Sequence, residues 1–420
     1  MSLADADLSH RVPDRPLLRL RRGEERRVRA GHLWIFSNEV DLARSSLSET
    51  DSLVTVMDDR GQPLGVAYYN PRTLIAARIL SHDASAIIDR SWMAARLRSA
   101  FSLRESQHRL PYYRWVFGES DGLPGLILDR YGSGVVGQIA TFGMQQLQGI
   151  IEEAITEVLP LDWMVWKNDS SARNLEGLAR EQTLAFGAWP TMLQAMETTA
   201  AGQSLCFEIP WEHAQKTGWF YDQAFNRELL PRFMPADARV LDVCCYGGGW
   251  SVAAAAGGAS AVTAIDASAA ALSMAEANFA RNSAVWSERS VSSRWLKGDA
   301  FARMAELEAS GDRYELVVVD PPAFIKRRKD LPQGRAAYRK LNQAAMRLMT
   351  QTGLLVSCSC SYHLSEADLL STIQSAARHS GKTLQVLHLG SQGPDHPVHP
   401  ALPETRYLKA IFCRVTTADG

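Results

Sequence analysis

Short apolar runs alternate with segments of helical periodicity through the second half of the chain. Residues 240–245, 261–265, 315–319 and 354–356 have the continuous apolar pattern of buried strands. Helical segments are predicted between and after them, including residues 269–281, 336–349 and 365–379. Two further strands are predicted at 384–389 and 407–415, as a hairpin. Buried strands that alternate with helices are typical of a doubly wound α/β sheet, whose ligands bind at the carboxyl ends of the strands. We assign this fold to residues 206–420.

The first half of the chain has a different pattern. Residues 17–80 are rich in strands and turns, with strands predicted at 53–57 and 64–69 around an Asp-Asp-Arg-Gly turn. A helix at 86–109, two strands around a Gly-Leu-Pro-Gly turn and a further helix at 145–158 then predict a mixed α+β region. We therefore expect a small β-rich domain at 15–85 and an α+β middle domain at 86–205.

One stretch, residues 239–266, combines a strand, a glycine turn, a helix and a second strand that ends in an acid. The turn contains Gly247, Gly248 and Gly249, where the backbone can bend tightly or approach a ligand closely. Asp266 ends the second strand, where a carboxylate can accept both hydroxyls of a ribose. Asp242 lies inside the first strand. Its charge would repel a pyrophosphate but attract an ammonium, which favours S-adenosylmethionine over NAD.

Composition and charge narrow the class of protein. The chain has 420 residues and a net charge of −1, and no apolar run is long enough to cross a membrane. We expect a cytoplasmic protein, because no signal peptide is present and the six cysteines do not form a disulfide pattern. Their spacing does not fit a zinc site, so no metal is expected. Two basic clusters, at residues 11–29 and 326–340, are candidate surfaces for nucleic acid or, alternatively, solvated helix faces.

Two loops at predicted strand ends carry candidate chemistry. Asp320-Pro-Pro-Ala-Phe324 follows the strand at 315–319, and its prolines and aromatic ring suit a planar base. Cys360 lies just past the next strand. A thiolate there could add to carbon 6 of a pyrimidine and make carbon 5 nucleophilic enough to accept a methyl group. Cys358 is still within the predicted strand, where an inert packing role is expected.

The ordered motifs resemble the bacterial 23S rRNA cytosine-C5 methyltransferases, in which a PUA domain and a middle domain precede a Rossmann-like methyltransferase domain. The resemblance covers nearly the whole chain. It rests on Gly-His-Leu-Trp-Ile-Phe from residue 31, Gly-Leu-Pro-Gly-Leu-Ile-Leu-Asp-Arg-Tyr from 122, Lys-Thr-Gly-Trp-Phe-Tyr-Asp-Gln from 216, Tyr-Gly-Gly-Gly-Trp from 246, Asp-Pro-Pro-Ala-Phe from 320 and Ser-Cys-Ser from 359.

The resemblance implies roles for particular residues. Cys360 would be the nucleophile, and Asp320 would lie beside the methyl donor and the base. The expected cofactor-binding residues are Asp242, Tyr246, Gly247, Gly248, Gly249, Asp266, Asp299 and Gln223. Cys244 and Tyr246 stand where many methyltransferases have glycines, so their contacts with the cofactor are expected to be backbone ones. The family lacks the second cysteine of other RNA cytosine-C5 enzymes, which leaves the base that removes the carbon-5 proton unnamed.

The sequence leaves three alternatives open. Uracil-C5 methylation uses the same thiol chemistry, and methylation of an exocyclic amine would make Cys360 incidental. An RNA-binding ribosome assembly factor would bind the cofactor without turnover. The expected partner is 23S rRNA, naked or in a partly assembled large subunit, with no membrane partner and with homodimerisation left open.

Overall fold

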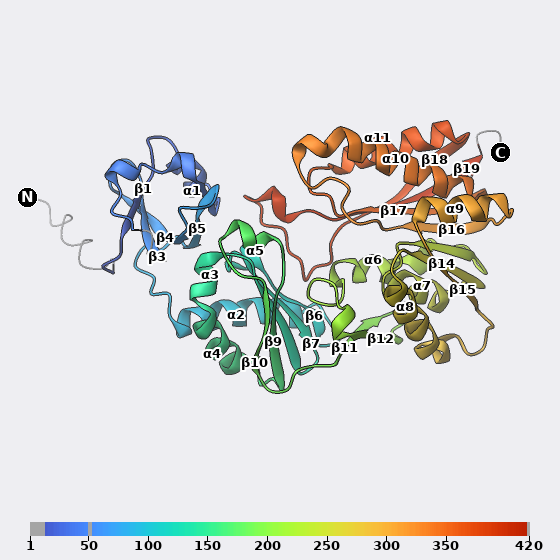
Figure 1. Cartoon of the computed structure of the whole chain (residues 1–420), viewed down its shortest axis with the longest axis horizontal. Helices are drawn as coiled ribbons and strands as arrows, with labels where there is room; N and C mark the ends of the chain where they lie inside the picture. Colours follow the sequence, from blue (N-terminus) through green and yellow to red (C-terminus); the bar gives the residue numbers. More distant parts are fainter. Residues whose placement is uncertain (1–12, 49–52, 418–420) are drawn as a thin grey trace, which may run out of the picture. The chain divides into compact units, whose positions relative to one another are not determined.

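The computed structural model describes residues 13–48 and 53–417. The chain forms two compact units (Figure 1). The first contains Met1–Pro190 and Pro394–Thr405, and the second contains Thr191–Gly393 and Arg406–Gly420. The segment Pro394–Thr405 therefore leaves the second unit and packs in the first. No helix in the described part of the chain is long and apolar enough to span a membrane.

The first unit begins with a five-stranded sheet around its own apolar core. Its strand order is β1 (Leu17–Arg19), β3 (Leu53–Met57), β4 (Pro63–Tyr69), β5 (Ile75–Ser81) and β2 (Trp34–Phe36), and the short helix α1 (Glu25–Arg29) joins β1 to β2. Apolar residues of these strands, such as Leu18, Ile35 and Val54, are fully buried. Leu402, from the returning segment, joins the same core.

A second five-stranded sheet completes the first unit. Its order is β10 (Glu181–Phe186), β9 (Trp163–Asn168), β8 (Gly134–Ile139), β7 (Leu126–Tyr131) and β6 (Tyr112–Phe117). The helices of this part are α2 (Arg90–Glu105), α3 (Phe142–Gln146), α4 (Gln148–Val158) and α5 (Ala172–Leu175). The helix predicted at 145–158 is interrupted at Leu147, which separates α3 from α4. Val66, Tyr68 and Leu80 of the first sheet belong to the core of this second sheet, so the two sheets share apolar packing.

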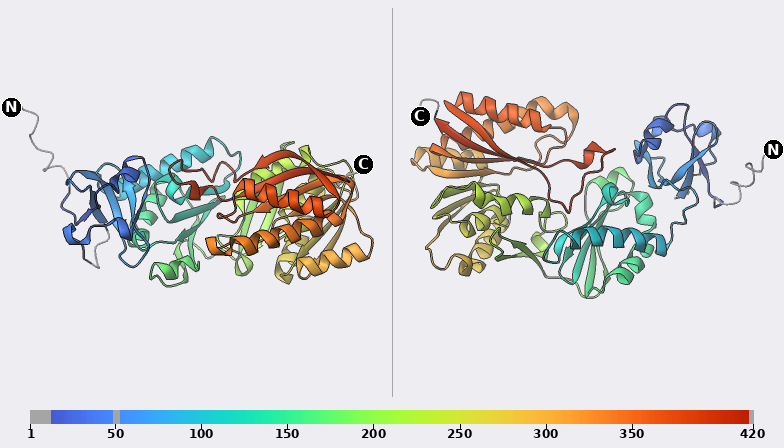
Figure 2. Two further views of the ribbon diagram at one scale, coloured as in Figure 1. Left: turned by 90° about the horizontal axis from the view of Figure 1, so that it is seen from above. Right: turned by 180° about the vertical axis from the view of Figure 1, so that it is seen from behind.

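The second unit contains a seven-stranded sheet with helices on both faces (Figure 2). Its order is β15 (Ser292–Lys297), β14 (Ala261–Asp266), β13 (Arg239–Val243), β16 (Tyr314–Val319), β17 (Met349–Ser359), β19 (Lys409–Thr417) and β18 (Lys382–Gly390). The first five strands are parallel, and β19 runs antiparallel to both neighbours. Helices α9 (Ala300–Ala309), α10 (Leu331–Arg347) and α11 (Glu366–His379) enclose one apolar core against the sheet, and α7 (Gly249–Ala256) and α8 (Ala269–Arg281) pack on the other face.

Two details of the second unit differ from the sequence prediction. The strand expected at 240–245 ends at Val243, because Cys244 has a left-handed backbone conformation. Strands β18 and β19 pair as predicted, but they are not a tight hairpin, since their connection includes the segment that packs in the first unit. The second unit begins with a hairpin of β11 (Met192–Thr198) and β12 (Ser204–Pro210). The domain boundary that the sequence places between Leu205 and Cys206 lies within β12.

Candidate active site at the carboxyl edge of the seven-stranded sheet

The carboxyl ends of the parallel strands bring the predicted site residues to one edge of the sheet. Strand order reverses at β13, whose neighbours are β14 and β16, and such a switch point is the usual ligand crevice of a doubly wound sheet. Asp266 is the last residue of β14, Asp320 follows β16, and Cys360 follows β17. Val319 of β16 pairs with Ser357 of β17, so the loops carrying Asp320 and Cys360 leave adjacent strands.

The turn after β13 has an unusual backbone. Cys244 (φ 67°), Tyr246 (φ 48°) and Gly248 (φ 79°) are all left-handed. Non-glycine residues in this region cost of order 1–3 kcal/mol each and are concentrated at functional sites. The sequence indicated that Cys244 and Tyr246 replace glycines of the general motif, and this backbone explains why glycine is common there. A Cβ on Gly247 would lie 2.8 Å from the Trp219 ring, so this position needs glycine for space.

Asp242 is the most buried acid of the site. Its Oδ2 accepts hydrogen bonds from the Ser251 amide (3.1 Å) and hydroxyl (2.7 Å). Its Oδ1 is buried and has no hydrogen-bond partner among the described residues. Burial raises the pKa of Asp242 to about 7, against the lowering effect of Ser251. An orphaned buried carboxylate oxygen needs a donor, and the ammonium of a methionine moiety would supply one. The residues present therefore fit S-adenosylmethionine.

Two further predicted cofactor residues have structural hydrogen bonds of their own. Asp266 accepts the Tyr246 amide through Oδ2 (3.0 Å) and the Ser268 amide through Oδ1 (2.9 Å). Asp299 is exposed and caps α9 by accepting the Ala302 amide (3.1 Å). The Tyr246 side chain also has a role that the sequence did not suggest: its hydroxyl donates to Gly218 O (2.9 Å), which fastens residues 215–218 over the glycine turn.

Asp320 is held by two donors on one oxygen. Its Oδ2 accepts from Gln223 Nε2 and from Trp250 Nε1, each at 3.0 Å, while Oδ1 has no hydrogen-bond partner in the described chain. Burial raises the pKa of Asp320 to about 6, the Trp250 hydrogen bond lowers it, and the neighbouring carboxylate of Asp222 raises it. Both side chains therefore position Asp320, a contact that the sequence did not predict for Gln223, expected among the cofactor residues, or for Trp250.

Cys360 and Cys358 occupy different environments, as predicted. Cys358 is fully buried within β17, and Cys360 is partly exposed just beyond the strand. Burial raises the pKa of the Cys360 thiol, the ammonium of Lys216 lowers it, and the carboxylates of Asp320 and Asp222 raise it. The thiol is therefore protonated at rest and needs local positive charge to act as a nucleophile.

A hydroxyl network joins the loop after Asp320 to the loop that carries Cys360, and sequence reasoning missed it. The Tyr338 hydroxyl of α10 lies 2.9 Å from Ser359 Oγ and 3.0 Å from Ser361 Oγ. Ser361 Oγ also accepts the amide of Ile325 in the loop after Asp320 (3.2 Å). The two serines flank Cys360 in the Ser-Cys-Ser motif, and this motif was the feature of the sequence from which the network could have been predicted. The network fixes the backbone on both sides of the thiol.

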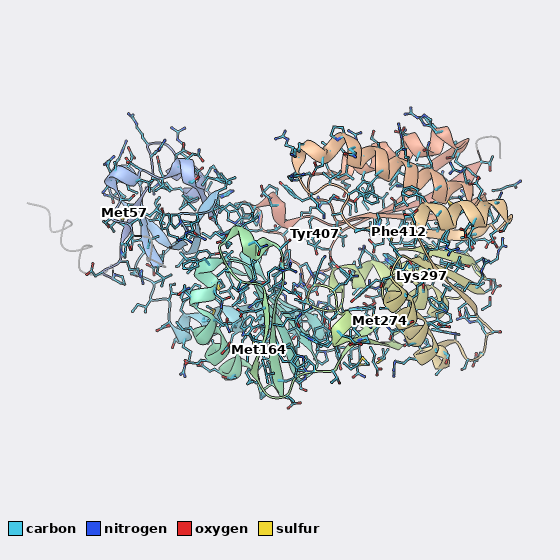
Figure 3. All side chains as sticks on the ribbon, in the orientation of Figure 1. Met57, Met164, Met274, Lys297, Tyr407 and Phe412 are labelled. Carbon is cyan, nitrogen blue, oxygen red and sulfur yellow. The ribbon has the colours of Figure 1, made fainter. Side chains whose placement is uncertain are left out.

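A second network of buried polar side chains lies next to the site. The buried carboxylate of Glu197, in hairpin β11–β12, pairs with Arg227 of helix α6 (Ala224–Leu229) and accepts Trp219 Nε1 (2.7 Å). Asp222 accepts the hydroxyl of Tyr407 (2.5 Å), which is labelled in Figure 3. Arg227 therefore pairs with Glu197, whereas Gln223, four residues earlier in the chain, donates to Asp320.

Comparison with known families identifies both ends of the chain. A model of the PUA-like domain matches residues 18–82, and a model of the S-adenosylmethionine-dependent methyltransferases matches residues 189–414. Ribosomal RNA large subunit methyltransferase I of Escherichia coli O139:H28 is 31% identical over 401 residues, which cover 94% of this chain and 98% of that protein. The protein of the same name from Shigella dysenteriae serotype 1 has the same identity and coverage.

Solved structures share the fold. The protein SMU.776, crystallised in complex with SAH, has a TM-score of 0.77 at 19% identity and covers 95% of this chain and 99% of its own. A Streptococcus mutans structure has a TM-score of 0.76 at 20% identity, with the same coverage. The predicted fold class, a Rossmann-like domain preceded by a PUA-like domain, is confirmed, and S-adenosylmethionine is the cofactor. The chain therefore belongs to the family of S-adenosylmethionine-dependent methyltransferases.

Proposed function

We propose that this methyltransferase acts on carbon 5 of a cytosine in 23S ribosomal RNA, through a covalent bond between Cys360 and the base. Two lines of support point to RNA of the large ribosomal subunit. The curated relatives are named as large-subunit rRNA methyltransferases, and a PUA-like domain precedes the methyltransferase domain. The choice of carbon 5 rests on one observation: a partly exposed cysteine, Cys360, at the strand end beside Asp320.

The proposed reaction uses Cys360 twice. Its thiolate forms a bond to carbon 6 of the cytosine, and the displaced electron pair makes carbon 5 nucleophilic. The bound cofactor supplies the methyl group that carbon 5 accepts. A base then removes the proton from carbon 5, and the electrons of that bond re-form the double bond as the Cys360 sulfur leaves. The products are 5-methylcytosine, the free thiolate, the base with the proton from carbon 5, and the cofactor without its methyl group.

Asp320 is proposed to balance charge on the ring. Its pKa of about 6 allows it to carry a proton close to neutral pH, and Oδ1 is open to a ligand. Thiolate addition increases electron density on ring nitrogen 3, where a hydrogen bond from a protonated carboxyl would stabilise the adduct. Gln223 and Trp250 fix the orientation of this carboxyl through Oδ2.

The cofactor residues are assigned by the same reasoning. Asp242 would accept the methionine ammonium through its orphaned Oδ1, and Asp266 would accept the ribose hydroxyls. Asp299 would meet the adenine amine with the carboxylate oxygen that does not cap α9. The backbone at Tyr246, Gly247, Gly248 and Gly249 would line the methionine moiety closely, because bulkier residues do not fit at Gly247.

The surface charges support RNA contact more at one basic cluster than at the other. In the cluster at 11–29, Arg11 lies outside the described residues, and five arginines bond within the unit: Arg15, Arg19, Arg21, Arg27 and Arg29. In the cluster at 326–340, Arg327 and Arg335 pair with carboxylates, and none of the other basic side chains forms a hydrogen bond or ion pair with a described residue. A groove of about 540 Å³ between α10 and α11 is lined by Arg335, Arg339 and Arg378 together with serines and a threonine. Such a surface suits phosphates.

One experiment separates the proposed reaction from its rivals. RNA that carries 5-fluorocytidine at the target should trap the wild-type protein in a bond stable to denaturation, because fluorine cannot leave as a proton. Trapping should need S-adenosylmethionine. Cys360→Ala should lose both methylation and trapping but keep its affinity for the cofactor, while the matched variant Cys358→Ala should keep both activities.

Other outcomes favour the alternatives. An active Cys360→Ala protein whose product is methylated on nitrogen would favour the exocyclic-amine reaction. Product found as 5-methyluridine in digested RNA would favour uracil, and absence of any methylated nucleoside with intact RNA binding would favour an assembly factor.

A further inference from the structure

Lys409, the first residue of β19, is a buried cation without an acidic partner. Four other Lys or Arg residues are similarly buried in the described chain, and each has a carboxylate within 4.0 Å: Arg104, Lys167, Arg173 and Arg227. Lys409 is only 4% exposed and forms no salt bridge with any described residue. Glu366, the carboxylate near it, pairs with Arg406 at 2.9 Å. Burying an ammonium without a counter-charge is costly, so this position calls for an explanation.

The hydrogen bonds of Lys409 point to the nucleophile loop. In the antiparallel ladder Lys409 is paired with Ser359, the residue before Cys360. Its Nζ donates to the carbonyl of Ser361, the residue after Cys360, at 2.7 Å, and to the carbonyl of Tyr407 at 2.8 Å. The ammonium is thus attached to the backbone that presents the thiol. The missing counter-charge would exist whenever Cys360 is a thiolate.

We propose that Lys409 is a positioning residue that fixes the Cys360 loop and stabilises the Cys360 thiolate by its positive charge. The proposal rests on the proposed function in one respect, that Cys360 is the nucleophile. The thiol proton leaves to solvent, which the partly exposed side chain can reach, and the ammonium keeps its own proton. The positive charge of Lys409 stabilises the Cys360 sulfur a second time, when the sulfur leaves carbon 6 as a thiolate.

Several charged groups surround this pair, and their signs show why a second cation is useful. Besides Lys409, the charged groups that act on Cys360 are the cation Lys216 and the acids Asp320 and Asp222, and Cys360 in turn affects the hydroxyl of Tyr338. Those that act on Lys409 are Cys360, Arg406 and Glu366. Burial lowers the pKa of Lys409 to about 8, and the neighbouring thiol group opposes this lowering. Lys409 is therefore still charged at neutral pH and loses its charge as the pH rises through about 8.

The test is the rate at which iodoacetamide alkylates Cys360, measured across a range of pH by mass spectrometry of the Cys360 peptide. An opposite charge at close range shifts a pKa by about 1 unit or more, so Lys409→Met should be alkylated roughly tenfold more slowly at neutral pH. The difference from wild type should shrink above the pKa of Lys409, because wild type then loses the same charge. Above the pKa of Lys409, Lys409→Arg should be alkylated faster than wild type, since a guanidinium stays protonated at that pH.

Controls separate charge from folding and from the proposed reaction. Lys382→Met makes the same change at the opposite end of the sheet, where Lys382 donates to Thr350 O, and should give the wild-type curve. If Lys409→Met does not fold, wild type and Lys409→Arg still differ as the pH rises through about 8. Identical curves for wild type and both Lys409 variants would overturn the proposal. The readout needs no RNA, so it stays valid if the methylated atom is not carbon 5.

Discussion

At the residue scale, the site places polar groups where the folded chain alone does not stabilise them. Cys244 and Tyr246 have left-handed backbones, and Asp242 has a buried oxygen without a donor. Each feature costs stability in the free protein and is explained by a ligand that approaches the turn. Binding of the cofactor should therefore relieve costs that the fold already contains.

Asp242→Asn tests whether the Asp242 carboxylate lowers the stability of the free protein and binds the cofactor. Because burial raises the pKa of Asp242 from its ordinary value to about 7, its contribution to stability is present at low pH and is lost as the pH rises through 7. Without cofactor, the variant should have nearly the wild-type free energy of unfolding at acid pH and a higher one above pH 7, by urea unfolding. Its affinity for S-adenosylmethionine should fall by about 1.5–3 kcal/mol in calorimetry, the usual value of a hydrogen bond to a charged group. Unchanged affinity would remove Asp242 from the cofactor site.

At the element scale, helices α10 and α11 extend from the two reactive loops. The loop after Asp320 leads into α10, and the loop after Cys360 leads into α11. The helices lie side by side (Figure 1), and the basic groove lies between them. Arg339 and Arg378 in this groove have no carboxylate partner in the part of the chain that is described. An RNA backbone bound in this groove would contact the two helices that follow the loops of Asp320 and Cys360.

Charge reversal tests the groove. Arg339→Glu and Arg378→Glu should each weaken RNA binding across sequences, and each should reduce the slope of log affinity against log salt by about 1. Fluorescence anisotropy at several salt concentrations measures both quantities. Arg294→Glu makes the same change of charge on β15, at the other edge of the sheet, and should leave the slope close to wild type. Equal losses for all three variants would indicate a general effect of net charge and not a contact in the groove.

At the scale of the whole molecule, the chain passes from one unit into the other and back. The segment Pro394–Thr405 is held in the first unit by Asp395, whose carboxylate accepts the Arg114 amide (2.9 Å) and pairs with His396 (2.8 Å). Arg104 donates to the carbonyl of Asp395 at 2.8 Å. Side chains from the first sheet also belong to the core of the second sheet. Deletion of residues 1–85 would expose that core, so it would not show by itself whether the PUA-like domain binds RNA. Substitutions at exposed arginines are the better test.

Asp395→Ala should destabilise the first unit by roughly 1–3 kcal/mol for each buried donor that loses its acceptor, namely the Arg114 amide and the His396 ring. Burial raises the pKa of Asp395, but His396, His108 and the hydrogen bond from the Arg114 amide outweigh burial and lower this pKa to about 2. Its stabilising effect is therefore complete above the unfolded value of about 3.9 and is lost as the pH falls towards 2. Urea unfolding and hydrogen exchange of the Arg114 amide measure the loss. Glu153→Ala, at an exposed carboxylate of α4, is the control, and an equal effect of the two variants would contradict this role.

The sequence by itself determined the strands, the helices and the strand-end acids of the second unit. Burial imposes a continuous apolar pattern on parallel strands, and ligands of such sheets bind at the strand ends, so the positions of Asp266, Asp320 and Cys360 followed from local patterns. The sequence could not show that Gln223 and Trp250 hold Asp320, because they come from elements far apart in the chain. It also could not show that most arginines of the basic cluster at 11–29 form hydrogen bonds or ion pairs within their own unit.

Only the tertiary structure placed Lys409 beside Cys360 and moved Pro394–Thr405 into the first unit. Strand order decides which distant residues become neighbours, and β19 inserts between β17 and β18 instead of following β18 at the edge of the sheet. A local pattern records whether a residue is buried, but not which element covers it. The placement of the buried cation Lys409 next to the Cys360 loop is therefore a property of the sheet order and cannot be derived from the residues on either strand alone.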